Sequence, residues 1–180
     1  DAEGTLIHRQ TGLGHRRLSI IDCTDAANQP MLDASGRYVI IFNGEIFNYR
    51  ELREELMRRG ATLRTQSDTE ALLLLLIQHG PAAIEKLNGF FAFAFYDKET
   101  GDMLIVRDRL GVKPLFYYQD KNMLAFASEM KSLLAYPFAR QLDQASLLLY
   151  MQLTYIPAPW SILKGVCKLP PGHYLQVKNG

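Results

Sequence analysis

The sequence predicts an α+β domain in which layers of helices enclose stacked antiparallel sheets. Short apolar runs that read as strands are separated by turn residues over much of the 180-residue chain. One of these strands, residues 90–96, is apolar throughout, which is typical of a strand covered on both faces. Two helices are expected early in the chain and two late, and this order favours helical layers on the outside of the sheets.

The boundaries of the elements follow from turn and capping residues. In chain order we expect strands at residues 5–9, 13–21 and 38–42, helices at 48–59, 67–80 and 81–88, strands at 90–96, 103–106, 115–118 and 123–127, helices at 128–134 and 143–153, and a strand at 174–177. Asn48 is expected to cap one helix, and Ser67 with Glu70 has the spacing of a capping box. The last strand is expected to enter a hairpin whose partner lies outside the chain, so we expect the chain to be cut at both ends.

Composition and charge exclude several classes of protein. Hydrophobic residues make up 48% of the chain and charged residues 22%, which argues against a disordered or fibrous protein. The net charge of +1 provides no excess field for a nucleic acid or an anionic membrane. The longest aliphatic run, Leu72 to Ile77, is far shorter than the ~20 residues that span a bilayer. We therefore expect a cytoplasmic domain without a nucleic-acid or membrane partner.

A cluster of positive charge lies within residues 12–22. His15, Arg16 and Arg17 are adjacent on a strand that is otherwise apolar, and such a cluster suits an anion. Arg17 could hold a ligand carboxylate through two parallel hydrogen bonds. The alternative, favoured on this segment alone, leaves His15 and Arg16 at a solvated edge and pairs Arg17 with a structural acid.

Two further segments carry groups for a small zwitterionic ligand. The Asn43 side chain and the Gly44 N–H, at the expected end of a strand, could form an oxyanion hole, although an Asn-Gly pair more often marks a hairpin turn. Asp68 begins a helix, where the helix dipole keeps a carboxylate ionised, so it could bind an ammonium group or act only as a cap. These residues together predict a pocket lined by a cation and carboxylates.

The remaining motifs favour structural roles. Residues 107–115 carry three basic residues around a glycine, but they are a poor match to phosphate-binding loops, and internal Arg/Asp pairing is the favoured interpretation. The four histidines lack the spacing of a metal site. Cys23 and Cys167 are expected to be buried apolar thiols rather than nucleophiles.

The motifs taken in order resemble the glutaminase domain of asparagine synthetases. The matching strings are residues 12–22, 42–49, 67–70, 87–94, 107–115, 126–129 and 169–174. The resemblance covers nearly the whole chain. It implies an N-terminal nucleophile hydrolase fold, which is a four-layer αββα sandwich, and the hydrolysis of glutamine to glutamate and ammonia.

The resemblance also implies a role for each candidate residue. A bound glutamine would meet a counter-charge at both of its charged groups and two donors at its oxyanion. The implied residues are Arg17, Leu18, Ile20 and Ile21 at the α-carboxylate, Asn43 and Gly44 at the oxyanion, and Glu45 and Asp68 at the α-ammonium.

In the resembled family the nucleophile is a cysteine at the N-terminus, in a Cys-Gly-Ile start. Residues 1–4 resemble instead the stretch that follows the family's His-Arg-Gly-Pro-Asp motif. The resemblance therefore implies that residues 1–180 are a glutaminase domain without its N-terminal nucleophile segment, and that this piece alone binds glutamine weakly and does not hydrolyse it. A synthetase domain that uses ATP and Mg is expected after residue 180 as a partner in cis, no cofactor is expected in the glutaminase domain, and a homodimer is allowed.

Two other interpretations remain open. The domain could serve a class II amidotransferase with another acceptor, although the Ser-Asp-Thr-Glu and Leu-Pro-Pro-Gly strings favour asparagine synthetase. It could also be a non-catalytic scaffold module. The presence of Arg17, Asn43, Gly44, Glu45 and Asp68 argues against a scaffold.

Overall fold

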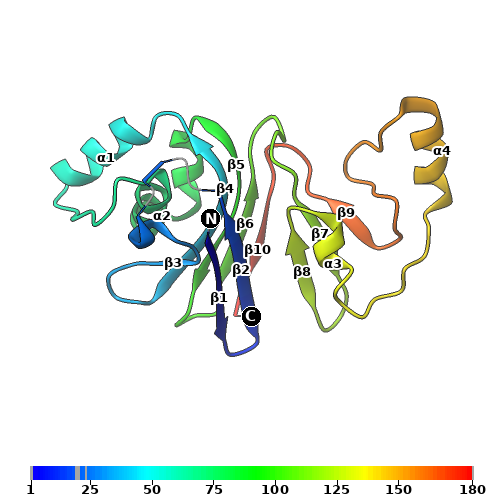
Figure 1. Ribbon diagram of the computed structural model, residues 1–180, viewed down its shortest axis with the longest axis horizontal. Helices are drawn as coiled ribbons and strands as arrows, with labels where there is room; N and C mark the ends of the chain where they lie inside the picture. The colour runs from blue at the N-terminus through cyan, green and yellow to red at the C-terminus, as the bar shows by residue number, and fades with distance from the viewer. Residues whose placement is uncertain (1, 19–20, 23, 180) are drawn as a thin grey trace. The chain divides into compact units, whose positions relative to one another are not determined.

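A computed structural model describes residues 2–18, 21–22 and 24–179. The chain forms two compact units, one of Asp1–Val106 with Tyr174–Gly180 and one of Arg107–His173, and each is treated by itself (Figure 1). All the residues implied to contact glutamine belong to the first unit. In the described part of the chain, no helix has the length and apolar character needed to cross a membrane.

The first unit contains a five-stranded sheet, a separate hairpin and the helices that cover the sheet. Its strands are β1 (Ala2–His8), β2 (Thr11–Arg17), β3 (Met31–Leu32), β4 (Tyr38–Ile46), β5 (Gly89–Asp97), β6 (Met103–Arg107) and β10 (Tyr174–Val177). Its helices are α1 (Tyr49–Arg58), α2 (Asp68–His79) and the 3-10 helices η1 (Asp25–Ala27) and η2 (Gly80–Lys86). The order in the five-stranded sheet is β10-β6-β5-β4-β3, and β1 pairs with β2.

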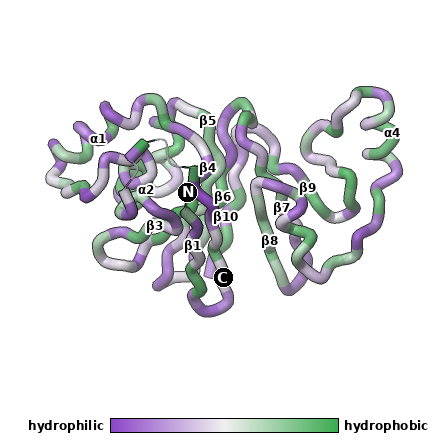
Figure 2. Tube along the Cα trace, in the orientation of Figure 1, coloured by the Kyte–Doolittle hydropathy of each residue, from purple (hydrophilic) through white to green (hydrophobic). Residues whose placement is uncertain are grey.

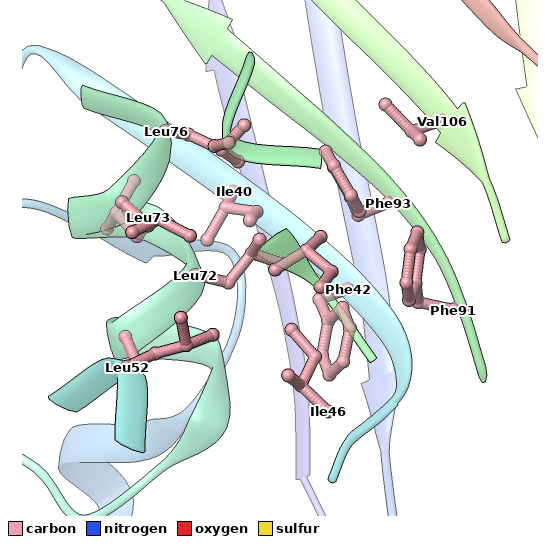
Figure 3. Packing of buried hydrophobic residues seen from close by; sticks show 14 of the residues in the cluster. Ile40, Phe42, Ile46, Leu52, Leu72, Leu73, Leu76, Phe91, Phe93 and Val106 are labelled. Atoms are coloured by element: carbon pink, nitrogen blue, oxygen red, sulfur yellow. The ribbon is translucent and has the colours of Figure 1, made fainter. Parts of the chain in front are cut away.

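Both faces of the five-stranded sheet are covered. Ile40 and Phe42 of β4 pack against α2 through residues such as Leu72 (Figure 3). The β1–β2 hairpin lies over the other face, where His8 Nδ1 is 3.1 Å from the hydroxyl oxygen of buried Tyr96. The four central residues of β5 are all buried, which confirms a strand covered on both sides. An α+β fold with stacked antiparallel sheets is therefore confirmed.

Several predicted boundaries and pairings need correction. β2 ends at Arg17, whereas the sequence predicts a strand to residue 21. Residues 174–177 do have a partner within the chain, because β10 pairs antiparallel with β6 from Tyr174 opposite Val106 to Val177 opposite Met103. That pairing joins segments about seventy residues apart. A local pattern therefore could not reveal it.

The capping predictions at the two long helices are each half right. Ser67 Oγ accepts a hydrogen bond from the Glu70 N–H at 3.2 Å, as predicted, but the Glu70 carboxylate bonds residues 64 and 65 instead of returning to the cap. Asn48 precedes α1 without capping it, and its amide bonds the Lys86 carbonyl and the Asn88 N–H. Asn48 therefore ties the start of α1 to the chain entering β5.

An ion pair beside the turn after β5 predicts a pH-dependent stability. Arg37 donates to both carboxylate oxygens of Asp97, at 2.9 and 2.7 Å, and holds the pKa of that carboxyl at about 2, below its ordinary 3.8. A depressed acid pKa contributes stability that is present above pH 3.8 and lost as the pH falls toward 2. We expect Arg37→Met to melt several degrees lower than wild type at pH 7 and at nearly the same temperature near pH 2, as thermal unfolding would show. Equal melting temperatures at pH 7 would refute the contribution.

The second unit is built on a three-stranded sheet. Its strands are β7 (Phe116–Gln119), β8 (Leu124–Ala127) and β9 (Val166–Lys168), in the order β8-β7-β9, and its helices are α3 (Met130–Leu133) and α4 (Gln144–Leu153). The hairpin β7–β8 confirms the predicted pairing. α4 is coloured hydrophobic over much of its length in Figure 2, and Leu148 and Met151 are exposed. Cys167 lies half-buried on β9, so the prediction of a buried thiol is wrong there, and Cys23 lies outside the described residues.

The loop that begins the second unit is held by its own main chain. The buried Asp108 carboxylate accepts hydrogen bonds at 3.0 Å from the N–H groups of Leu110, Val112 and Lys113. Arg107 donates to three main-chain carbonyl oxygens. The favoured interpretation of a self-contained loop is confirmed, although these contacts go to the main chain instead of joining arginine to aspartate. A phosphate would need N–H groups that Asp108 already uses.

Candidate functional site

Arg17 ends β2 and organises the loop that follows. Its Nη2 donates to the carbonyl oxygens of Ile21, at 2.9 Å, and Asp22, and its Nη1 donates to the side-chain oxygen of Asn28 at 3.2 Å. Among the ion pairs between described residues, none involves Arg17, so the expected structural acid is not found. Arg17 therefore places an uncompensated cation beside neutral acceptors.

The neighbours of Arg17 differ from it in exposure. Arg16 is exposed and pairs with Glu3 at 3.2 Å, as the solvated-edge interpretation predicts. Leu18 is 75% exposed, and its side chain therefore contributes nothing to a buried contact. The Ile21 carbonyl is an Arg17 partner, and Ile20 lies outside the described residues.

Asp22 connects this loop to the start of α2. Its carboxylate accepts from the Thr24 hydroxyl at 2.6 Å and from the Gln66 N–H at 2.6 Å, and these bonds, the first of them most strongly, lower the Asp22 pKa. Gln66 lies two residues before Asp68. Through Asp22, the segment that carries Arg17 is fixed to the segment that carries Asp68.

Asn43 and Gly44 lie inside β4, so the hairpin-turn interpretation is wrong. They pair with Ala92 and Phe91 of β5, and the strand continues to Ile46. Gly44 has a φ of 156°, and a Cβ built on it would lie 2.1 Å from the Phe90 carbonyl oxygen. Only glycine lets the two backbones approach so closely.

The outer edge of β4 is bonded by side chains where β3 no longer covers it. The Phe42 N–H donates to Gln29 Oε1 at 2.6 Å, and the Ile46 N–H donates to Asp68 Oδ2 at 3.1 Å. Because N–H directions alternate along an antiparallel strand, the Gly44 N–H faces this same edge between those two bonds. The edge thus presents the N–H predicted for the oxyanion hole beside Asp68.

Asp68 and Glu45 form a negative pair at this edge. Asp68 is 5% exposed, and burial is the main cause that raises its pKa, with the nearby Glu45 charge adding to the effect against main-chain hydrogen bonds from Ile46 and Thr69. No ion pair between described residues includes either carboxylate. A buried carboxylate beside a second one favours a cationic ligand, which would lower the Asp68 pKa again.

His15 and Gln29 are parts of the site that sequence reasoning missed. His15 Nε2 lies 3.0 Å from the Phe42 carbonyl oxygen, so the side chain is half-buried against β4 and not at a solvated edge. Gln29 is buried and takes the N–H of the same residue. Neither has a periodic or motif signal, because their partner is main chain of a strand distant in sequence. In the described part of the chain, no cluster of three His, Cys, Asp or Glu residues could hold a metal.

The fold defines the class of protein first. The structure of glutamine phosphoribosylpyrophosphate amidotransferase from B. subtilis matches with a TM-score of 0.59 at 23% identity, over 73% of this chain and 31% of that chain. This likeness confirms the predicted N-terminal nucleophile hydrolase type of fold. The family follows from the sequence match: the chain belongs to the glutamine amidotransferase domain family, whose model covers residues 1–180.

Curated relatives extend beyond this chain. Asparagine synthetase [glutamine-hydrolyzing] 1 of Bacillus subtilis is 39% identical over 99% of this chain and 28% of the relative. Asparagine synthetase [glutamine-hydrolyzing] 3 of the same organism is 38% identical over 90% of this chain and 27% of the relative. The chain thus spans about a quarter of the length of these relatives.

Proposed function

We propose that this amidotransferase domain binds L-glutamine at the outer edge of β4, between Arg17 and Asp68. The observation that carries the proposal is that hydrogen bonds join the three candidate segments into one site. Arg17 holds the loop whose Asp22 bonds Gln66, and Asp68 bonds β4 two residues beyond Gly44. A cation, a carboxylate pair and a main-chain donor thus surround a space matched to the groups of an α-amino acid amide.

Each group of glutamine has a proposed partner. The α-ammonium lies against Asp68 and Glu45, where it relieves the buried negative charge that raises the Asp68 pKa. The α-carboxylate takes the Arg17 guanidinium from the neutral carbonyl oxygens of the loop, because a charge-assisted hydrogen bond is about twice as strong as a neutral one. Main-chain groups near Leu18, Ile20 and Ile21 complete that end of the site.

The reactive carboxamide points to Asn43 and Gly44. Thiolate attack on the carboxamide carbon produces a tetrahedral oxyanion, which the Gly44 N–H and the Asn43 amide stabilise before the C–N bond breaks and ammonia leaves. Cys167 belongs to the second unit and is not proposed as the nucleophile. The family resemblance assigns that role to an N-terminal cysteine, so residues 1–180 alone are expected to bind glutamine without hydrolysing it.

The whole protein is proposed to be a cytoplasmic asparagine synthetase. The names of the relatives support transfer of the ammonia to aspartate by a synthetase domain in cis that uses ATP and Mg, with a homodimer as a further state. The competing proposal keeps the glutaminase and changes the acceptor. Measuring amide formation by the whole protein with aspartate and with other carboxylate acceptors separates the two.

Replacing Arg17 by lysine tests the binding site. Lysine keeps the charge but loses the planar fork that grips a carboxylate, and we expect Arg17→Lys to bind glutamine about tenfold or more weakly by calorimetry. Arg16→Lys is the matched control, because Arg16 is the exposed neighbour that pairs with Glu3. Equal weakening by both variants, or by neither, would contradict the assignment of Arg17.

A further inference from the structure

We infer that His15 is a positioning residue which, together with Gln29, clamps the main chain of Phe42 and so aims the Asn43–Gly44 segment at the glutamine carboxamide. The inference deepens the proposed function and rests on it. It concerns the geometry of the oxyanion donors, which the charged residues of the site do not control.

The clamp acts where β4 has lost its neighbouring strand. β3 pairs only with Val39 and Ile40, so the outward-facing N–H and C=O of Phe42 have no ladder partner on that side. Gln29 Oε1 accepts from the N–H at 2.6 Å, and His15 Nε2 lies 3.0 Å from the carbonyl oxygen. Two side chains thus take the place of a strand at one residue.

The position of Phe42 makes this bond pattern relevant to catalysis. Its carbonyl carbon is joined directly to the nitrogen of Asn43, so a hydrogen bond to that carbonyl fixes the plane of the peptide that leads into Asn43 and Gly44. An unclamped edge peptide can tilt. A misplacement of about 1 Å in a reacting group can cost about a hundredfold in rate.

The clamp also links both ends of the site. Leu13, His15 and Arg17 alternate along β2 and share its inward face, so the strand that presents Arg17 presents His15 two residues earlier. Gln29 Nε2 lies 3.5 Å from the Thr69 hydroxyl, beside Asp68 at the start of α2. One residue of β4 is therefore held from the Arg17 strand and from the Asp68 helix.

The state of the imidazole follows from its partners. A carbonyl oxygen only accepts, so Nε2 carries the hydrogen. Burial, with a smaller contribution from the Arg17 charge, lowers the His15 pKa and keeps the ring neutral near pH 7. Among the described residues, Nδ1 is buried without a hydrogen-bond partner, which agrees with a bare lone pair and would penalise a proton there.

The first test needs no ligand. In ¹⁵N spectra of the chain, His15 should show the Nε2–H tautomer. The amide resonances of Asn43 and Gly44 should shift in His15→Phe and return toward wild type in His15→Gln, whose amide can donate to the same carbonyl. His8→Phe is the matched control, because His8 bonds the Tyr96 hydroxyl instead. A dominant Nδ1–H tautomer in wild type overturns the inference even if His15→Phe does not fold.

The second test separates positioning from general stability. L-Norvaline carries the α-amino acid group of glutamine but has a methyl group in place of the carboxamide. We expect His15→Phe to weaken glutamine binding about fivefold to tenfold while norvaline binding changes less than about twofold, and His15→Gln to restore glutamine binding. Equal weakening for both ligands would show a purely structural role and overturn the inference. If wild type binds neither ligand, the proposed function fails, and the ligand-free spectra still decide whether the clamp exists.

Discussion

Gly44→Ala is expected to destabilise the β4–β5 pair by about 3 kcal/mol or more. The added Cβ would lie 2.1 Å from the Phe90 carbonyl oxygen and 2.7 Å from Phe91 Cα, and both of these are backbone atoms in the middle of a sheet. A flexible side chain could move aside, but here a strand must shift. The shift would also displace the N–H proposed to bind the oxyanion.

Amide hydrogen exchange along β4 and β5 measures this effect in the unit where it arises. Protection of residues 39–46 and 91–97 should fall by about two orders of magnitude or more in Gly44→Ala. Gly12→Ala is the matched control, since Gly12 is also a strand glycine and its added Cβ meets nothing within 4 Å. Unchanged protection in Gly44→Ala would mean that the close approach of the two backbones is wrong.

Asp68→Asn is expected to abolish most glutamine binding without loss of stability. Asparagine retains an oxygen that can accept from the Ile46 N–H, so the bond to β4 survives, whereas the charge that meets the α-ammonium is lost. Loss of a charge-assisted contact of about 2–3 kcal/mol corresponds to roughly 30-fold to 150-fold weaker binding.

The stability half of this prediction follows from the sign of the Asp68 pKa shift. Burial raises this pKa, so ionised Asp68 is less favourable in the folded chain than in the unfolded one. Its cost to stability appears as the pH rises through the folded pKa and is full at pH 7. Asparagine removes that cost, so Asp68→Asn should unfold at the same urea concentration as wild type or a higher one.

Two measurements on the same samples check the Asp68 prediction. Calorimetry with glutamine should show the loss of affinity, and urea unfolding at pH 7 should show retained stability. Glu51→Gln, a loss of charge at an exposed carboxylate in the first turn of α1, should change neither quantity. A destabilised Asp68→Asn variant that still binds glutamine would reverse the role given to Asp68, making it a structural cap.

Local chemistry explains which elements the sequence could predict. Ser67 and Asp143 each accept a hydrogen bond from the N–H three residues later, and such caps depend only on neighbouring residues. The apolar run of β5 likewise reports its own burial. Charged candidates such as Arg17 and Asp68 were visible because a cation beside an apolar strand or a carboxylate at a helix start is unusual in itself.

The strand through Asn43 and Gly44 depended on a fact that local pattern cannot hold. Gly89 faces Ile46 across the β4–β5 pair, and a Cβ on it would lie 2.2 Å from the Glu45 carbonyl oxygen. Glycines on both strands permit the close approach that extends β4. Without knowledge of the register, an Asn-Gly pair is better explained as a turn.

The connecting residues of the site were hidden for a similar reason. Asp22, Gln29 and His15 each bond main-chain atoms of a segment at least thirteen residues away. A side chain that bonds distant backbone needs no partner side chain and follows no spacing rule. Sequence reasoning therefore identified the charges that meet a ligand and missed the groups that hold those charges in place.

The central claim is that Arg17, Asp68 and the outer edge of β4 form one glutamine site, and site-resolved titration of the wild-type chain tests it most directly. L-Glutamine should produce saturable shifts at the amides of Gly44, Ile46 and Asp22, the last because Arg17 leaves its loop carbonyls for the ligand carboxylate, while D-glutamine should produce none. The absence of saturable shifts, equal shifts with both enantiomers, or shifts confined to residues 107–173 would contradict the claim.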